Sequence, residues 1–164
     1  MLPSQALFSK RIIFLTICLI ISVALFIRIK YVENTKIYKP IRADARQYVI
    51  YGYNLYHHGI FSKELSSNEP LPDSSRSPGY PLLMSLAFMI GGKRGFYPIV
   101  IYTQTILSAL SVYLTFLLGI RILSSVWWAL FAASLVAISP HLISMTSYLL
   151  TETLFGFILL LALV

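Results

Sequence analysis

Residues 97–120 form a run of 24 residues without a charged side chain, and this run constrains the fold of the chain more than any other feature. The run is apolar almost throughout, and Arg121 follows it directly. A helix needs about 20 mostly apolar residues to cross the roughly 30 Å hydrocarbon core of a bilayer. The run therefore predicts a transmembrane helix.

The composition of the whole chain favours the same class of protein. Hydrophobic residues make up 57% of the 164 residues and charged residues 12%, about half of the roughly 25% that is usual in a soluble domain. So few charges cannot cover the apolar surface of a chain of this length with groups that water solvates. We expect an all-α, polytopic integral membrane protein.

Three more segments have the composition of membrane spans, at about residues 11–29, 122–139 and 152–164. The first resembles the apolar part of a signal peptide, but it is longer than usual and no small-residue cleavage site follows it, so we interpret it as a retained helix. Trp127 and Trp128 lie near one end of the third span, where interfacial aromatic residues belong. The fourth is still apolar at Val164, which favours a truncated sequence.

A polar loop over about residues 30–96 separates the first two spans, and we predict two interfacial helices in it, at 44–58 and 81–90. Asp44 is expected to cap the first helix and Gly59 to end it in the left-handed conformation. Its four tyrosines suit the headgroup layer. Residues 81–90 are too few to span a bilayer. The loop with Asp44 and the connection at 140–151 are then expected on the same side of the membrane.

The basic residues leave the orientation of the chain open. With the N-terminus inside, ten of the 13 Lys and Arg residues would lie outside, contrary to the positive-inside rule, which weakens for loops near 60 residues. The formal net charge of +7 is not accompanied by a nucleic-acid-binding motif. We therefore expect anionic lipids or a lipid-phosphate substrate as partners and no nucleic acid.

Two of the six acidic residues are candidates for a site. Asp44 begins the tyrosine-rich helix, and Glu152 lies where an apolar span begins, a depth at which an ionisable group is a functional hypothesis by default. The ordinary alternatives are a helix cap for Asp44 and a first-turn carboxylate for Glu152. The predicted topology puts both on one side, which favours a shared site.

The RSPGYP sequence at residues 76–81 is the second candidate element. Its two prolines stiffen the chain and fix where Arg76 points, and Pro81 is expected to open a helix. A guanidinium at the membrane surface binds phosphate well, although interaction with lipid headgroups is an equal alternative. His141 is expected as a polar wall of the site. Cys18, the single cysteine, excludes an intramolecular disulfide and a cysteine zinc site.

Together these elements resemble the GT-C membrane glycosyltransferases, in particular bacterial relatives of protein O-mannosyltransferases and aminoarabinose transferases. The resemblance covers almost the whole chain. The matching sequences, in order, are DARQY at 44–48, GIFS at 59–62, RSPGYPLL at 76–83, Gln104 with LSAL at 107–110, SP at 139–140 and TETLF at 151–155.

The resemblance implies a multi-pass protein of the plasma (inner) membrane with its catalytic loop outside the cytoplasm, and a polyprenyl-phosphate sugar as donor. It implies catalytic roles for Asp44 and Glu152. Arg76, Tyr48, Tyr80 and His141 are the predicted substrate-binding residues. A divalent metal cation held by Asp44 and Glu152 stays open, as do the sugar and the acceptor, which could be a protein, a lipid or a polysaccharide.

Two other readings are consistent with the sequence. The chain could be a non-catalytic or truncated membrane protein, or an accessory subunit that binds lipid or partner helices. A transporter subunit ranks last, because the spans offer little polar surface beyond Gln104 and Ser or Thr side chains.

Overall fold

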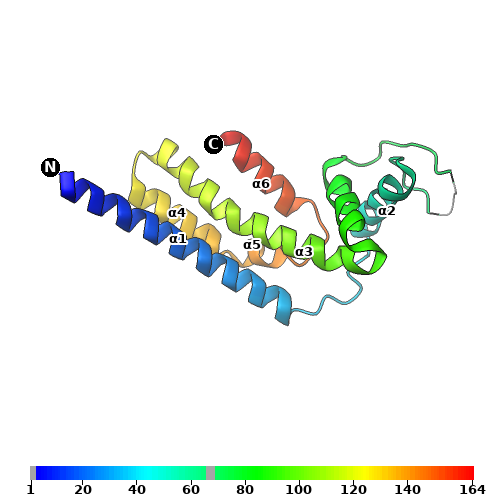
Figure 1. Ribbon diagram of the computed structural model, residues 1–164, viewed down its shortest axis with the longest axis horizontal. Coiled ribbons are helices and arrows are strands. Elements are labelled where there is room, and N and C mark those ends of the chain that lie inside the picture. Colours follow the sequence, from blue (N-terminus) through cyan, green and yellow to red (C-terminus); the bar gives the residue numbers. More distant parts are fainter. Residues whose placement is uncertain (1–2, 66–68) are drawn as a thin grey trace.

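The computed structural model describes residues 3–65 and 69–164, and side chains from residue 10 onward (Figure 1). All regular structure in the described residues is helical. The helices are α1 (Pro3–Asn34), α2 (Asp44–His58), α3 (Gly79–Leu123), α4 (Val126–Ile138), α5 (Pro140–Met145) and α6 (Glu152–Leu163).

Within the described residues, two helical segments are long and apolar enough to cross a membrane, Lys10–Asn34 of α1 and Gly79–Leu123 of α3. They contain the predicted spans at 11–29 and 97–120. The predicted span at 122–139 is shorter than expected, because α4 has 13 residues, fewer than the roughly 17 needed to span a bilayer. The predicted segment at 152–164 corresponds to α6, which has 12 residues. The extended backbone of Ser139 (φ −60°, ψ 116°) ends α4, and Pro140 begins α5.

A kink at Gly92 divides α3 into two limbs. Gly92 has φ 60° and ψ −166°, a conformation that residues with a Cβ atom rarely adopt. The predicted interfacial helix at 81–90 is thus the first limb of α3, and the predicted span lies in the second limb. Figure 1 shows the first limb turned away from the bundle and packed beside α2, at the end of the molecule opposite the N-terminus.

Two clusters of buried side chains hold these parts together. One joins α1, the second limb of α3 and α4, and its members are Ile17, Ala24, Val112, Phe116, Ala129, Leu130, Ala133 and Ala137. The small residues among them allow the close helix contacts that are typical of membrane proteins. The other cluster joins α2 to both limbs of α3, and includes Tyr48, Tyr80, Met84 and Phe88, with Phe96 from the second limb. We call α2 with the first limb of α3 the head.

The ends of α2 differ in how well the sequence predicted them. Gly59 ends the helix in the left-handed conformation (φ 68°, ψ 14°), as expected. The prediction that Asp44 caps the helix was wrong, because Ala43 occupies the cap position, makes no side-chain cap hydrogen bond, and is followed by Asp44 as the first helical residue. Pro81 does not open α3, which begins two residues earlier at Gly79.

Gly52→Ala should destabilise the head. A Cβ atom at Gly52 of α2 would lie 2.3 Å from Met84 Cβ and 3.1 Å from the Pro81 carbonyl oxygen of α3, so the two helices would have to move apart. Overpacking of this kind costs about 1–3 kcal/mol. Thermal unfolding of the purified protein in detergent measures the effect. Gly156→Ala is the control, because no atom lies within 4 Å of its new Cβ. Equal unfolding temperatures for the two variants would contradict this packing.

Candidate functional site

Asp44 and Arg76, which are 32 residues apart in the sequence, form an ion pair at the surface of the head. Arg76 Nη2 lies 2.5 Å from Asp44 Oδ1, and Arg76 Nε donates a hydrogen bond to Gln47 Oε1 at 2.7 Å. The guanidinium carbon lies 5.3 Å from the centroid of the Tyr48 ring. The Asp44 side chain is 56% exposed, and such pairs stabilise a fold by only about 0–1 kcal/mol. The main effect of these contacts is to orient the carboxylate.

The tyrosines that were predicted to bind substrate lie beneath this pair, in the core of the head. Tyr48 and Tyr80 are buried and pack edge to face, with ring centroids 5.2 Å apart. The Tyr80 hydroxyl donates a hydrogen bond to Gln104 Oε1. The two rings thus support the Asp44–Arg76 pair from below, and Tyr80 has its hydroxyl engaged within the protein.

Gln104 connects this layer to the segment that precedes α6. Its Nε2 atom donates hydrogen bonds to the carbonyl oxygens of Thr146 (3.2 Å) and Tyr148 (2.9 Å). Gln104 is fully buried, so these bonds satisfy an amide that would be costly to bury alone. Contacts therefore run continuously from Asp44 and Arg76 through Tyr48, Tyr80 and Gln104 to residue 148.

Asp44 and Glu152 line two different cavities, and the prediction that they share a site stays a prediction. Asp44 borders a cavity of about 240 Å³, between residues 37–45 and residues 148–150. Glu152 borders a second cavity of about 250 Å³ between α3, α5 and α6. Residues 148–150 border the first cavity and lead directly into the helix that carries Glu152. The two carboxylates thus line separate cavities, and residues 148–150 connect the two regions along the chain.

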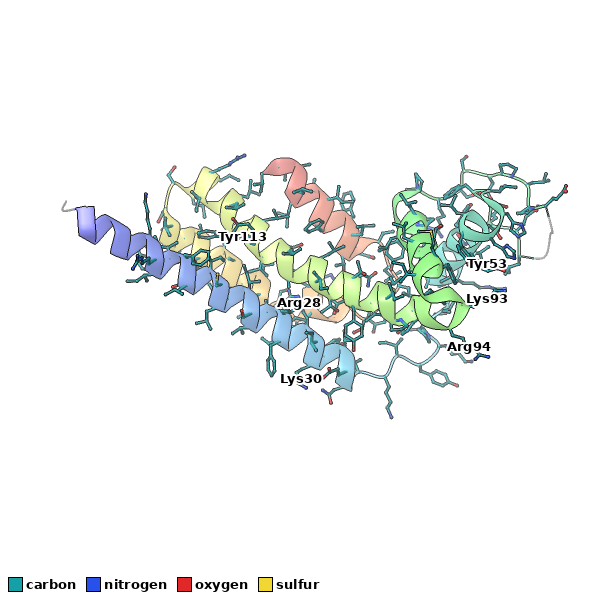
Figure 2. All side chains as sticks on the ribbon, viewed as in Figure 1. Arg28, Lys30, Tyr53, Lys93, Arg94 and Tyr113 are labelled. Carbon is teal, nitrogen blue, oxygen red and sulfur yellow. The ribbon has the colours of Figure 1, made fainter. Side chains whose placement is uncertain are left out.

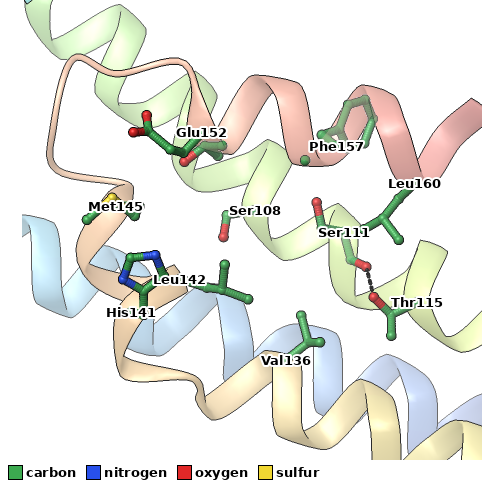
Figure 3. Close-up of a pocket in the computed structure, with 12 residues that line it drawn as sticks. Ser108, Ser111, Thr115, Val136, His141, Leu142, Met145, Glu152, Phe157 and Leu160 are labelled. Carbon is green, nitrogen blue, oxygen red and sulfur yellow. Dashed lines mark hydrogen bonds between the residues drawn. The ribbon is translucent and has the colours of Figure 1, made fainter.

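The cavity at Glu152 has a polar end and a mainly apolar body (Figure 3). Glu152 and His141 lie toward the end nearest the 146–151 loop, as Figure 3 shows. Ser108, Ser111 and Thr115 line the α3 wall. The hydroxyls of Ser111 and Thr115 donate to carbonyl oxygens one turn earlier in α3, at 3.0 and 2.8 Å. This shape suits a ligand with an apolar body and one polar end.

Arg28 has an important structural role that was not predicted from the sequence. It is fully buried in the middle of the bundle (Figure 2). Its Nε donates to Ser108 Oγ at 2.8 Å, its Nη1 to the carbonyl oxygens of Ala137 at 2.8 Å and Ala24 at 3.1 Å, and its Nη2 to that of Val136 at 3.1 Å. Within the described residues no carboxylate pairs with it.

The partners of Arg28 explain how a charge is tolerated there. Two are carbonyls in the last turn of α4, where backbone acceptors lack partners within the helix and the helix dipole is negative. Arg28 thereby joins α1 to α3 and α4. In the sequence, Arg28 is a basic residue at the edge of an apolar run. This is also the usual position of a charge that flanks a membrane span. Because α1 continues to Asn34, Arg28 lies inside the helix.

Asp73 anchors the loop that carries Arg76. The Tyr51 hydroxyl donates to Asp73 Oδ1, and the backbone N–H groups of Lys63 and Ser75 donate to its two oxygens at 2.8 and 3.0 Å. The bond from Tyr51 is the largest of the effects that hold the pKa of the Asp73 carboxyl well below its usual range. Burial of Tyr51 raises the pKa of its phenol. The loop is therefore fixed three residues before Arg76.

Asp73→Asn should loosen this loop at neutral pH. A carboxyl with a lowered pKa stabilises the folded state above its unfolded pKa of about 4, and this contribution is lost as the pH falls toward the folded value. Hydrogen exchange of the backbone around residues 62–64 and 73–76 measures the effect. We expect protection in the wild-type protein at pH 5–7 that falls below about pH 4, and little protection at any pH in Asp73→Asn. Glu33→Gln, at an exposed pair with Lys30, is the control. Full protection in Asp73→Asn would exclude this anchoring role.

The described residues contain no group of three or more His, Cys, Asp or Glu side chains that could hold a metal ion. Comparison with other proteins adds no assignment. No protein-family model matches the chain, and no significantly similar protein was found among curated proteins or solved structures.

Proposed function

We propose that the protein is a GT-C-type glycosyltransferase that moves a sugar from a polyprenyl-phosphate carrier to a hydroxyl acceptor. The observation that supports this proposal most is the Asp44–Arg76–Gln47 arrangement. It joins the DARQY and RSPGYP sequences, two of the elements on which the resemblance rests. The contacts through Tyr80 and Gln104 add a third element to the same region.

In the proposed reaction Asp44 acts as the general base. The acceptor oxygen attacks the anomeric carbon of the donor, the bond between that carbon and the phosphate oxygen breaks, and the carboxylate takes the acceptor's proton. The configuration at the anomeric carbon is inverted. Arg76 holds the Asp44 carboxylate in one orientation and Gln47 holds Arg76, so we assign both a positioning role. This revises the expectation that Arg76 binds the donor phosphate.

The cavity at Glu152 contributes less to this proposal than the cavity at Asp44. Its apolar body and its polar end at Glu152 and His141 suit part of a lipid substrate, with Glu152 near the reacting end. A metal bridging Asp44 and Glu152 is not part of the proposal, because the two residues border different cavities.

The proposed location is the plasma (inner) membrane, with the head and the 146–151 loop on its outer side and with α4 to α6 also within the bilayer. Both parts border the cavity at Asp44, which supports a shared side. Single cysteines at the exposed position 74 and the partly exposed position 151, in a variant without Cys18, should both react with an impermeant thiol reagent added to intact cells. Reaction from opposite sides of the membrane would exclude this topology.

Transfer itself tests the function. Membranes that contain the full chain should release free polyprenyl phosphate from a polyprenyl-phosphate sugar and move the labelled sugar to envelope material. Membranes without the chain are the control. Equal transfer in both preparations, across hexose and pentose donors, would contradict the proposal.

One observation favours a second candidate, an accessory subunit that binds partner helices. None of the residues of α6 is buried, although the helix is apolar. An exposed apolar helix in a bilayer is able to pack against another helix as well as against lipid. Co-purification of a catalytic subunit, together with no transfer by the chain alone, would favour this candidate.

A further inference from the structure

We infer that Lys39 and Arg42 form the binding site for the phosphate group of the lipid donor, in the cavity beside Asp44. This inference rests on the proposed function and adds the residues that hold the departing phosphate. Both residues line the 240 Å³ cavity, and Asp44 lines the same cavity. A phosphate held there would put the bond to be broken next to the proposed base.

Arg76 is already engaged, which is why another cation is needed. Its Nη2 contacts Asp44, its Nε contacts Gln47, and its guanidinium carbon lies over the Tyr48 ring. Moving Arg76 to a phosphate would release the carboxylate that it orients. Stabilising the negative charge of a leaving phosphate requires a cation near it, and the cations that border the cavity with Asp44 are Lys39 and Arg42.

Lys39 and Arg42 keep their charges available for a ligand. Within the described residues, the ion pairs are Lys30–Glu33 and Arg76–Asp44, and no hydrogen bond is formed by the side chains of Lys39 or Arg42. Lys39 Nζ lies 5.4 Å from the centroid of the exposed Tyr38 ring. A guanidinium binds a phosphate through two parallel hydrogen bonds, and an ammonium adds a compact charge.

The backbone around these residues has two positions with positive φ. Lys39 has φ 53° and Ala43 has φ 47°, values that residues with a Cβ atom adopt rarely. They bend the chain on either side of Arg42. The cavity is also lined by residues 148–150, among them Leu149 and Leu150, which suit the first carbons of an isoprenoid chain.

Direct binding of polyprenyl phosphate tests the site without requiring transfer. The full chain, purified in a zwitterionic detergent, is titrated with radiolabelled polyprenyl phosphate. Replacing both Lys39 and Arg42 by Gln removes two charges and keeps side chains of similar length. We expect the affinity to fall at least about tenfold, the range for loss of hydrogen bonds to a charged group. Lys93→Gln with Arg94→Gln is the matched control, because it removes the same charge from the kink of α3 (Figure 2) and should leave the affinity unchanged.

Competition with the labelled lipid shows which kind of phosphate compound the site prefers. Phosphatidylglycerol vesicles should not displace the labelled lipid, and inorganic phosphate should displace it only at high concentration. Unchanged affinity in the Lys39/Arg42 variant, equal loss in the Lys93/Arg94 control, or displacement by phosphatidylglycerol would overturn the inference. Asp44→Asn should still bind, because Asp44 is not a phosphate ligand here.

The two proposals fail in different ways. If transfer occurs and the Lys39/Arg42 variant keeps the wild-type KM for the donor, the phosphate site is wrong and the function stands. If the wild-type chain binds polyprenyl phosphate through Lys39 and Arg42 but transfers no sugar from any donor, the phosphate site stands and the glycosyltransferase function fails.

Discussion

Asp44→Asn is expected to lower sugar transfer by about 10²–10⁴-fold, the usual contribution of a general base, without changing membrane insertion. The Asn side chain has the same size as Asp, and its carbonyl oxygen is able to accept the hydrogen bond that Arg76 now gives to Asp44. It cannot take up the acceptor's proton. Initial rates of transfer from a polyprenyl-phosphate sugar, measured at equal amounts of folded protein, give the size of the loss.

Arg76→Lys is the informative companion of this variant. A lysine keeps the positive charge but cannot contact Asp44 and Gln47 together with the geometry of a guanidinium. If Arg76 only positions the base, kcat should fall while the KM for the donor stays near its wild-type value. A raised KM with unchanged kcat would instead assign Arg76 to the donor. Wild-type turnover in Asp44→Asn would remove Asp44 from the mechanism.

Arg28→Ala should cause the largest loss of stability of any single substitution in the bundle. It removes the hydrogen bonds to Ser108, Ala137 and Val136 and leaves a cavity where α1, α3 and α4 meet. Each lost hydrogen bond from a charged donor typically costs about 1.5–3 kcal/mol, and the cavity left by a large side chain adds to the loss. Unfolding by heat or by a denaturing detergent, followed by circular dichroism in micelles, measures the change.

One further variant, with a control, distinguishes the effect of the Arg28 charge on stability from the effect of its side-chain volume. Arg28→Met fills much of the space but leaves the same carbonyls without donors, so we expect a smaller loss than for alanine but a clear one. Lys30→Ala is the control, because Lys30 is 55% exposed in its pair with Glu33 and such pairs contribute about 0–1 kcal/mol. Wild-type stability in Arg28→Met would show that the buried hydrogen bonds are not needed.

Much of the helical pattern was predictable because its signals are local. The uncharged run at 97–120 is long enough to specify a membrane-length helix whatever its neighbours are. The helix at 44–58 has the residues expected for it, and Gly59 ends it because glycine takes the left-handed conformation at little cost. The short length of α4 was not predictable, because an apolar segment has the same composition whether it spans a bilayer or not.

The sequence by itself therefore determined that the chain is helical, that it is apolar enough for a bilayer, and where its tyrosine-rich helix lies. Only the tertiary structure decided which polar groups meet. It paired Asp44 with Arg76, it put Ala43 and not Asp44 at the helix cap, and it placed Asp44 and Glu152 at the edges of two different cavities. It also buried Arg28 against residues 80 to 109 positions away. Such contacts depend on how separate helices pack, and no local pattern of residues encodes that geometry.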